Sequence, residues 1–198
     1  LHFTIHSFPT RRSSDLLAVA LQDQGRFEEA LPMHQDAIEA FREQFGNAYP
    51  GLASAMARYA FSLHLHGDYE QAAAVHEDAL ALRRAILPEE HPHIASSLIR
   101  YGWLKAEQGS GEEAEAMVRN GMAMLGQFVP ETHWEMHAAQ GILAFALIRQ
   151  GEIDAGRARL VPVYRGFRAM FGPDDWRTRR AEQVLRQTGG VPRASAEE

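Results

Sequence analysis

Four glycines recur along this chain at a constant spacing of 42 residues, and no other feature constrains the fold as strongly. They are Gly25, Gly67, Gly109 and Gly151. Five residues after each glycine stands a small residue, in the order Ala30, Ala72, Ala114 and Gly156. A period of this length indicates stacked supersecondary units that bury their core between neighbours, so the sequence predicts a repeat protein.

The apolar residues inside each unit follow a helical period. One face shows the spacing i, i+3, i+4, i+7 at Met56, Tyr59, Ala60 and Leu63. Each glycine is expected to end a first helix, because glycine adopts the left-handed conformation after a helix without a Cβ penalty. A second helix then follows. The predicted fold class is all-α, an α-solenoid of stacked antiparallel helix pairs with a C-terminal capping helix.

The expected helices fall into three sets. First helices are expected near residues 17–24, 52–66, 94–108 and 135–150. Second helices are expected near residues 27–45, 69–86, 111–127 and 153–171. The capping helix is expected near residues 175–187, which carry several arginines and few apolar residues, as a polar terminal cap needs.

Three local features add expectations about these helices. Asp68 and Gln71 resemble a capping box at the start of a second helix. Pro162 lies inside the fourth second helix and is expected to kink or split it, because proline lacks a backbone donor. Gly111 and Gly156 replace an aromatic residue and an alanine of earlier units, so the later repeats are expected to pack more loosely.

The start of the chain does not follow the repeat. Residues 6–16 resemble, residue for residue, one reading frame of a widely used short-read sequencing adapter. We therefore expect residues 1–16 to be a non-native segment, and we do not interpret its paired arginines as an export signal. The repeat domain is expected over residues 17–188, and a disordered tail over residues 189–198.

The best-preserved unit resembles a tetratricopeptide repeat. It follows the dipeptide His91-Pro92 and carries the family positions Leu98, Tyr101, Gly102, Gly109, Glu112, Glu113 and Ala114. The 42-residue unit is similar to the longer, kinesin-light-chain type of these repeats. The resemblance covers about residues 17–188. It implies a scaffold whose first helices line a concave groove that holds a peptide of a partner protein.

Two sets of side chains, each repeated with the same period, are candidate partner-binding residues of that groove. The first is the aromatic set Phe61, Trp103 and Phe145, which offers large contact area at low rotamer entropy. The alternative is that these rings pack between neighbouring first helices. The second set is Arg58 and Arg100, whose forked donors suit carboxylates of a ligand. The alternative is that both arginines are solvated or paired internally.

The sequence shows no pattern of a catalytic or metal site. The chain has 10 histidines and no cysteine. His64 and His66 are two residues apart on a predicted helix, so they point to different faces and do not form a ligand pair. No glycine-rich phosphate loop, Gly-x-Ser-x-Gly elbow or His-Glu-x-x-His helix occurs. We expect no enzymatic activity, no cofactor and no metal.

Charge and hydropathy narrow the class of partner. The formal net charge of −6 repels nucleic acid at neutral pH. No apolar run approaches the roughly 20 residues that span a bilayer. We expect a cytoplasmic protein that binds a protein or peptide, and neither nucleic acid nor a membrane. Self-association stays open. So does the alternative that these repeats are the C-terminal regulatory region of a larger bacterial signalling protein, such as a serine/threonine kinase.

Overall fold

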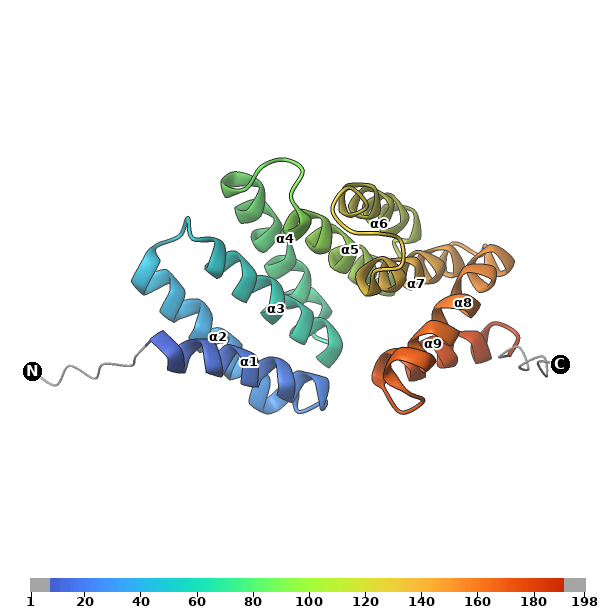
Figure 1. The fold of residues 1–198 in the computed structure, drawn as a ribbon, viewed down its shortest axis with the longest axis horizontal. Helices are drawn as coiled ribbons and strands as arrows, with labels where there is room; N and C mark the ends of the chain where they lie inside the picture. The colour runs from blue at the N-terminus through green and yellow to red at the C-terminus, as the bar shows by residue number, and fades with distance from the viewer. Residues whose placement is uncertain (1–7, 191–198) are drawn as a thin grey trace, which may run out of the picture. The chain divides into compact units, whose positions relative to one another are not determined.

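The computed structural model describes the backbone of residues 8–190 and the side chains of residues 16–190. Within that range the regular elements are nine α-helices and no strand (Figure 1). They are α1 (Phe8–Asp23), α2 (Phe27–Phe45), α3 (Pro50–His66), α4 (Tyr69–Ile86), α5 (Pro92–Glu107), α6 (Gly111–Leu125), α7 (Trp134–Arg149), α8 (Ile153–Phe171) and α9 (Trp176–Gln187). The predicted all-α class is confirmed.

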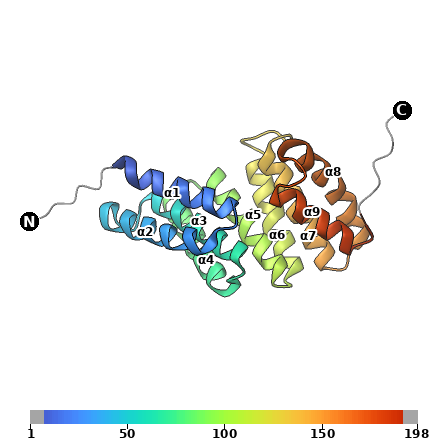
Figure 2. The same ribbon diagram turned by 90° about the horizontal axis from the view of Figure 1, so that it is seen from below.

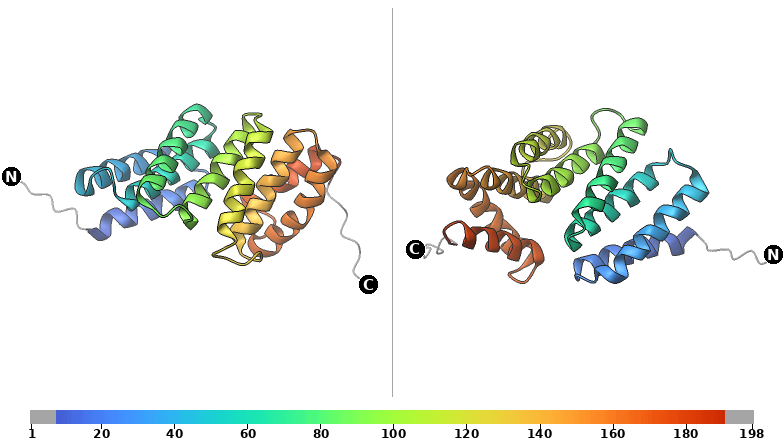
Figure 3. Two further views of the ribbon diagram at one scale, coloured as in Figure 1. Left: turned by 90° about the horizontal axis from the view of Figure 1, so that it is seen from above. Right: turned by 180° about the vertical axis from the view of Figure 1, so that it is seen from behind.

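The chain divides into two compact units within α5, the first ending at Ser97 and the second beginning at Leu98. In unit 1, consecutive helices from α1 to α4 pack against one another. In unit 2, the same holds for consecutive helices from α6 to α9. Figures 2 and 3 show the helix pairs inside each unit. Each unit is therefore built from the helix pairs that the period predicts.

The first helices end where the glycines stand. Gly67 has a φ of 105°, and the following Asp68 amide donates to the carbonyl of Leu63 at 2.9 Å. This bond satisfies a carbonyl that the last turn of α3 leaves without a helical partner. The glycines at the other repeat positions also have positive φ: Gly25, Gly109 and Gly151.

Most helices lie within about two residues of their predicted bounds, and α1 is the exception. It begins at Phe8 instead of near residue 17, and so continues through the segment that resembles an adapter. Pro9 lies in its first turn, where a missing backbone donor costs nothing. The non-native origin of residues 1–16 stays a prediction. The predicted tail lies outside the described residues except for Gly189 and Gly190.

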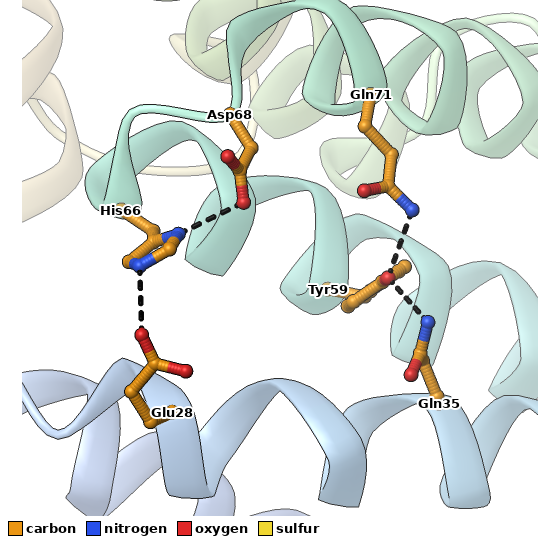
Figure 4. A network of polar contacts seen from close by, with 6 residues as sticks. All are labelled: Glu28, Gln35, Tyr59, His66, Asp68 and Gln71. Atoms are coloured by element: carbon orange, nitrogen blue, oxygen red, sulfur yellow. Dashed lines mark hydrogen bonds and ion pairs between the residues drawn. The ribbon is translucent and has the colours of Figure 1, made fainter.

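The predicted split at Pro162 and the predicted capping bond of Asp68 were wrong. Helix α8 is continuous through Pro162, and a kink there stays a prediction. The carbonyl that loses its helical donor there belongs to Ala158, which is exposed, so water can satisfy it. The Asp68 side chain makes no capping bond to α4. It accepts a bond from His66 instead, while Gln71 donates to Tyr59 (Figure 4).

The core of unit 1 is formed by small and branched residues from both helices of each pair. Leu52 and Leu63 on α3 are 2% exposed, and Ala30 and Ala72 at the repeat positions of α2 and α4 are fully buried. Arg83 ties α4 to the start of α5, since its guanidinium donates to the carbonyl of His93 at 2.7 Å and to Ser97 Oγ at 2.6 Å. These two bonds hold the end of α4 against the start of α5.

Unit 2 is closed by α9, which packs on the last helix pair. Its core consists of Ala144, Leu160, Val163, Tyr164, Phe167, Ala181, Val184 and Leu185. Arg157 on α8 donates to the carbonyls of Thr188 at 2.5 Å and Gly190 at 3.1 Å. These carbonyls lie at the end of α9, where helical donors run out, so Arg157 fixes the C-terminal end of the capping helix.

The prediction that the later repeats pack more loosely was wrong at Gly111 and Gly156, the two glycines on which it was based. A Cβ on Gly156 would lie 2.7 Å from the carbonyl oxygen of Ala144, and a Cβ on Gly111 would lie 2.6 Å from Cγ of Gln150. Real Cβ atoms do not come so close to other heavy atoms. Glycine at these positions allows a close approach of neighbouring helices.

Candidate partner-binding residues

Trp103 lies on α5 in unit 2 and faces the capping helix. Its ring is parallel to that of Trp176 at the start of α9, with an interplanar angle of 5° and centroids 6.1 Å apart. Its indole nitrogen Nε1 donates to Glu107 Oε1, one turn later on α5, at 3.0 Å. The orientation of the Trp103 ring is therefore fixed on two sides.

Glu107 joins Trp103 to a second residue of α9. Arg180 Nη2 donates to the same oxygen, Oε1, at 2.5 Å, and the Glu107 side chain is only 10% exposed. The Arg180 guanidinium also lies over the Phe145 ring of α7, 5.7 Å from its centroid. One carboxylate thus positions both a tryptophan and an arginine. We call Trp103, Glu107, Phe145, Trp176 and Arg180 the aromatic cluster.

Two of the predicted aromatic residues, Trp103 and Phe145, meet in this cluster. Both are half-buried. Phe145 also packs on Ala106 and Ala146, so part of its surface does fill the space between first helices. The ring therefore packs between first helices on one part of its surface and faces Arg180 on another, while its role in partner binding stays a prediction.

Sequence reasoning missed Trp176 and Arg180, because α9 was interpreted only as a polar cap. One signal was available. Trp134 and Trp176 are one period apart, and each is the first residue of its helix. Next to Trp176, the Arg177 guanidinium lies 4.6 Å from the indole centroid and is paired with Asp175 at 3.0 Å. The N-terminal end of α9 is thus rich in aromatic and cationic groups.

The remaining candidates lie in different parts of the fold. Arg58 and Phe61 are half-buried on α3 in unit 1, and the Phe61 ring contacts the His64 ring edge-on at 6.2 Å. Arg100 is half-buried on α5 in unit 2. The structure does not place Arg100 in the aromatic cluster, and its role stays a prediction.

Unit 1 contains two polar networks between its helices (Figure 4). In one, His66 Nδ1 bonds Asp68 at 2.8 Å, and His66 Nε2 lies 3.5 Å from Glu28 on α2. The hydrogen bond to Asp68 is the main cause that raises the pKa of His66, and the nearby negative charges add to it. This network ties the α3–α4 turn to α2.

In the other network, the Tyr59 hydroxyl accepts bonds from Gln35 at 2.6 Å and Gln71 at 3.1 Å. Burial raises the pKa of Tyr59, while the two amide donors act against this shift. The three residues belong to α2, α3 and α4, so the network joins three helices. Neither network has the geometry of a nucleophile and its base.

Among residues 16–190, no group of three or more histidine, aspartate or glutamate side chains could hold a metal ion. In the same part of the chain, no helix is long and apolar enough to cross a membrane.

With the geometry in place, the chain can be compared with known proteins. Residues 10–85 match the family model of the tetratricopeptide repeat. The matched residues run from α1 to α4. They include the helix-ending glycines Gly25 and Gly67 and the small residues Ala30 and Ala72. A search of curated proteins found no match.

Several solved structures have a similar fold. A putative kinesin light chain from Podosopora anserina with nearly identical repeats has a TM-score of 0.67 and 19% identity, over 89% of this chain and 84% of that one. BtubC from P. vanneervenii has a TM-score of 0.65 and 18% identity, over 82% of this chain and 65% of that one. MamA from Desulfovibrio magneticus has a TM-score of 0.52 and 15% identity, over 94% and 97%. The predicted α-solenoid fold class is confirmed.

Proposed function

We propose that this chain is an adaptor that binds a segment of a partner protein at the aromatic cluster of unit 2. Tetratricopeptide folds are typical of protein-interaction scaffolds. The observation that carries the proposal is the parallel stack of Trp103 and Trp176, held beside Arg180 by the nearly buried Glu107. The proposal involves no catalysis and no cofactor.

The cluster suits binding because its side chains are fixed before a partner arrives. Tryptophan and arginine dominate protein-binding energy because they combine large contact area with directional polar groups. Here Glu107 accepts bonds from both Trp103 and Arg180, so neither has to be ordered on binding. Such preorganisation lowers the entropic cost of association. The partner's main contact is expected to be an apolar or aromatic side chain against the indole rings.

Arg58 and Phe61 are proposed as a separate contact region on α3. They belong to unit 1, so a partner segment that also reached them would have to contact both units. Arg100 on α5 is proposed as an additional contact for a carboxylate of the partner. Both assignments are secondary to the aromatic cluster.

The test uses peptides selected on the full chain from a random peptide library. Their affinities are measured by calorimetry for the wild type and for the variants Trp103→Ala and Trp176→Ala. Each variant should weaken binding at least about tenfold, the loss that a hot-spot tryptophan causes. Circular dichroism should show that both variants keep the helical fold.

The chain provides a matched control in its third tryptophan. Trp134 begins α7, is 43% exposed and lies outside the cluster. Trp134→Ala should bind the selected peptides as the wild type does. The proposal fails if the cluster variants keep full affinity, or if Trp134→Ala loses as much affinity as they do.

A further inference from the structure

The second helices of the first and last repeats carry opposite charge. Both are 19 residues long. Helix α2 has a single arginine, Arg42, and five carboxylates: Glu28, Glu29, Asp36, Glu39 and Glu43. Helix α8 has a single carboxylate, Asp154, and four arginines: Arg157, Arg159, Arg165 and Arg168. Although the chain has a net charge of −6, both α8 and α9 carry four arginines and a single carboxylate.

The arginines of α8 differ from those of α9 in how they are paired. On α9 the side chains of Arg177, Arg179, Arg180 and Arg186 each pair with a carboxylate. On α8, Arg165 and Arg168 are exposed and make no ion pair with any described residue. Arg168 Nη1 donates to the Tyr164 hydroxyl at 3.2 Å, which leaves its charge unpaired among the described residues. Unpaired cations thus gather on the outward face of α8.

The outward face of α2 is the acidic counterpart. Asp36, Glu39 and Glu43 follow the spacing i, i+3, i+7, so they lie on one face of the helix. All three are exposed, and none pairs with a cation among the described residues. The other two carboxylates of α2 have partners: Glu29 pairs with Arg26, and Glu28 lies beside His66.

We propose that the outward face of α8 in one molecule binds the outward face of α2 in a second copy. The contact joins unlike surfaces, so it is heterologous and links molecules head to tail. A second copy is the favoured occupant because α2 of the same chain supplies the complementary charge on a helix of equal length. This surface is separate from the aromatic cluster, so the inference does not depend on the proposed function.

The strength and the salt dependence of this association follow from the properties of exposed ion pairs. Each pair contributes little on its own and is screened by salt, so the contact is expected to be weak and to depend strongly on ionic strength. Complementary fields mainly speed up encounter and fix orientation. Dilute protein in physiological salt is therefore expected to be largely monomeric.

The first experiment is sedimentation velocity on the full chain over protein concentrations from about 10 to about 300 µM, in about 20 mM and about 300 mM salt. We expect the weight-average sedimentation coefficient to rise with concentration at low salt and to stay at the monomer value at high salt. A monomer at every concentration in low salt would overturn the proposal.

Charge reversal then tests which faces meet. The pair Arg165→Glu and Arg168→Glu should abolish association, as should the pair Glu39→Lys and Glu43→Lys. Mixing the two variants should restore it, because the unchanged α2 of the first variant can bind the unchanged α8 of the second, and the two reversed faces are also complementary to each other. Failure of the mixture to associate would contradict the assignment.

The control reverses two exposed carboxylates of α4, Glu77→Lys and Asp78→Lys, which changes net charge by the same amount. This variant should associate as the wild type does, and equal loss would show that only overall charge matters. A labelled polyglutamate peptide and a short DNA duplex serve as alternative anions. If the wild type stays monomeric but binds either one through Arg165 and Arg168, α8 has a different occupant and the self-association proposal is rejected.

Discussion

Units 1 and 2 share a repeat, but they stabilise equivalent positions in different ways. Five residues after the helix-ending glycine, unit 1 has Ala72, a fully buried methyl group. Two periods later, unit 2 has Gly156, where the backbone of Ala144 leaves no room for a methyl group. Both positions therefore require a small residue, but the packing around Ala72 accommodates a methyl group and the packing around Gly156 does not.

The polar contacts around the repeat tyrosine differ in the same manner. In unit 1, Tyr59 accepts bonds from two neutral amides, Gln35 and Gln71. In unit 2, the equivalent Tyr101 lies under Lys105, whose ammonium is 5.2 Å from the ring centroid and pairs with Glu113 at 3.1 Å. The same large residue is thus held by hydrogen bonds in one unit and by a charged pair in the other.

The largest expected effect tests what the two units share. Leu63 and Leu147 are two periods apart and are 2% and 4% exposed. Leu63→Ala and Leu147→Ala should each lower the free energy of unfolding by about 2–5 kcal/mol, because each leaves a cavity in a packed core. Urea unfolding measures both. A difference of more than about 3 kcal/mol, the width of that range, would contradict the equivalence of the two positions.

The second prediction concerns Gly156, where the other unit has Ala72. Gly156→Ala should destabilise the chain by about 1–3 kcal/mol, because its methyl group would overlap the Ala144 carbonyl and the Ile148 side chain. An alanine is stabilising at most exposed helix positions, so the sign of the change is the informative result. Thermal unfolding reports it. A gain in stability would mean that the helices of the last pair can move apart at no cost.

A smaller effect is expected at the tyrosine of unit 1. Tyr59→Phe removes the acceptor shared by Gln35 and Gln71, and should cost about 1 kcal/mol. The loss is limited because both glutamines are exposed and can bond water instead. Chemical unfolding of this variant gives the value. A cost above about 3 kcal/mol would show that the network does more than join three helices.

The smallest expected effect is a pH dependence located in unit 1. The bond to Asp68 raises the pKa of His66 above its unfolded value. Its contribution is therefore fully present below the unfolded pKa of about 6.5 and is lost as pH rises through the folded pKa. The free energy of unfolding of the wild type should fall by less than about 1 kcal/mol relative to His66→Asn as pH rises from about 6 to about 8. Parallel pH profiles for the two proteins would contradict this assignment.

The fold was predictable from the sequence because its determinants are local. Gly67 ends α3 through its own backbone conformation, and Ala72 marks the face that α4 buries. Local rules failed where tertiary contacts decide the outcome. Asp68 stands at the N-cap position of α4, but its carboxylate bonds His66 instead of the helix. Helix α8 continues through Pro162, next to the exposed Ala158.

The candidate site was predictable only in part. Trp103 and Phe145 follow the period, so a search along the repeat finds them. Arg180 does not, because its partner Glu107 is 73 residues away in sequence and the contact depends on how α9 packs on the last helix pair. Tertiary structure is needed to bring those two residues together.

The most direct measurement of the adaptor account uses the indole NMR signals of the three tryptophans. In a titration of the ¹⁵N-labelled chain with a selected peptide, the signals of Trp103 and Trp176 are predicted to shift together, while that of Trp134 stays in place. The aromatic cluster would then be the binding site. Shifts confined to Trp134, or no indole shift at saturating peptide, would place the partner elsewhere and contradict the account.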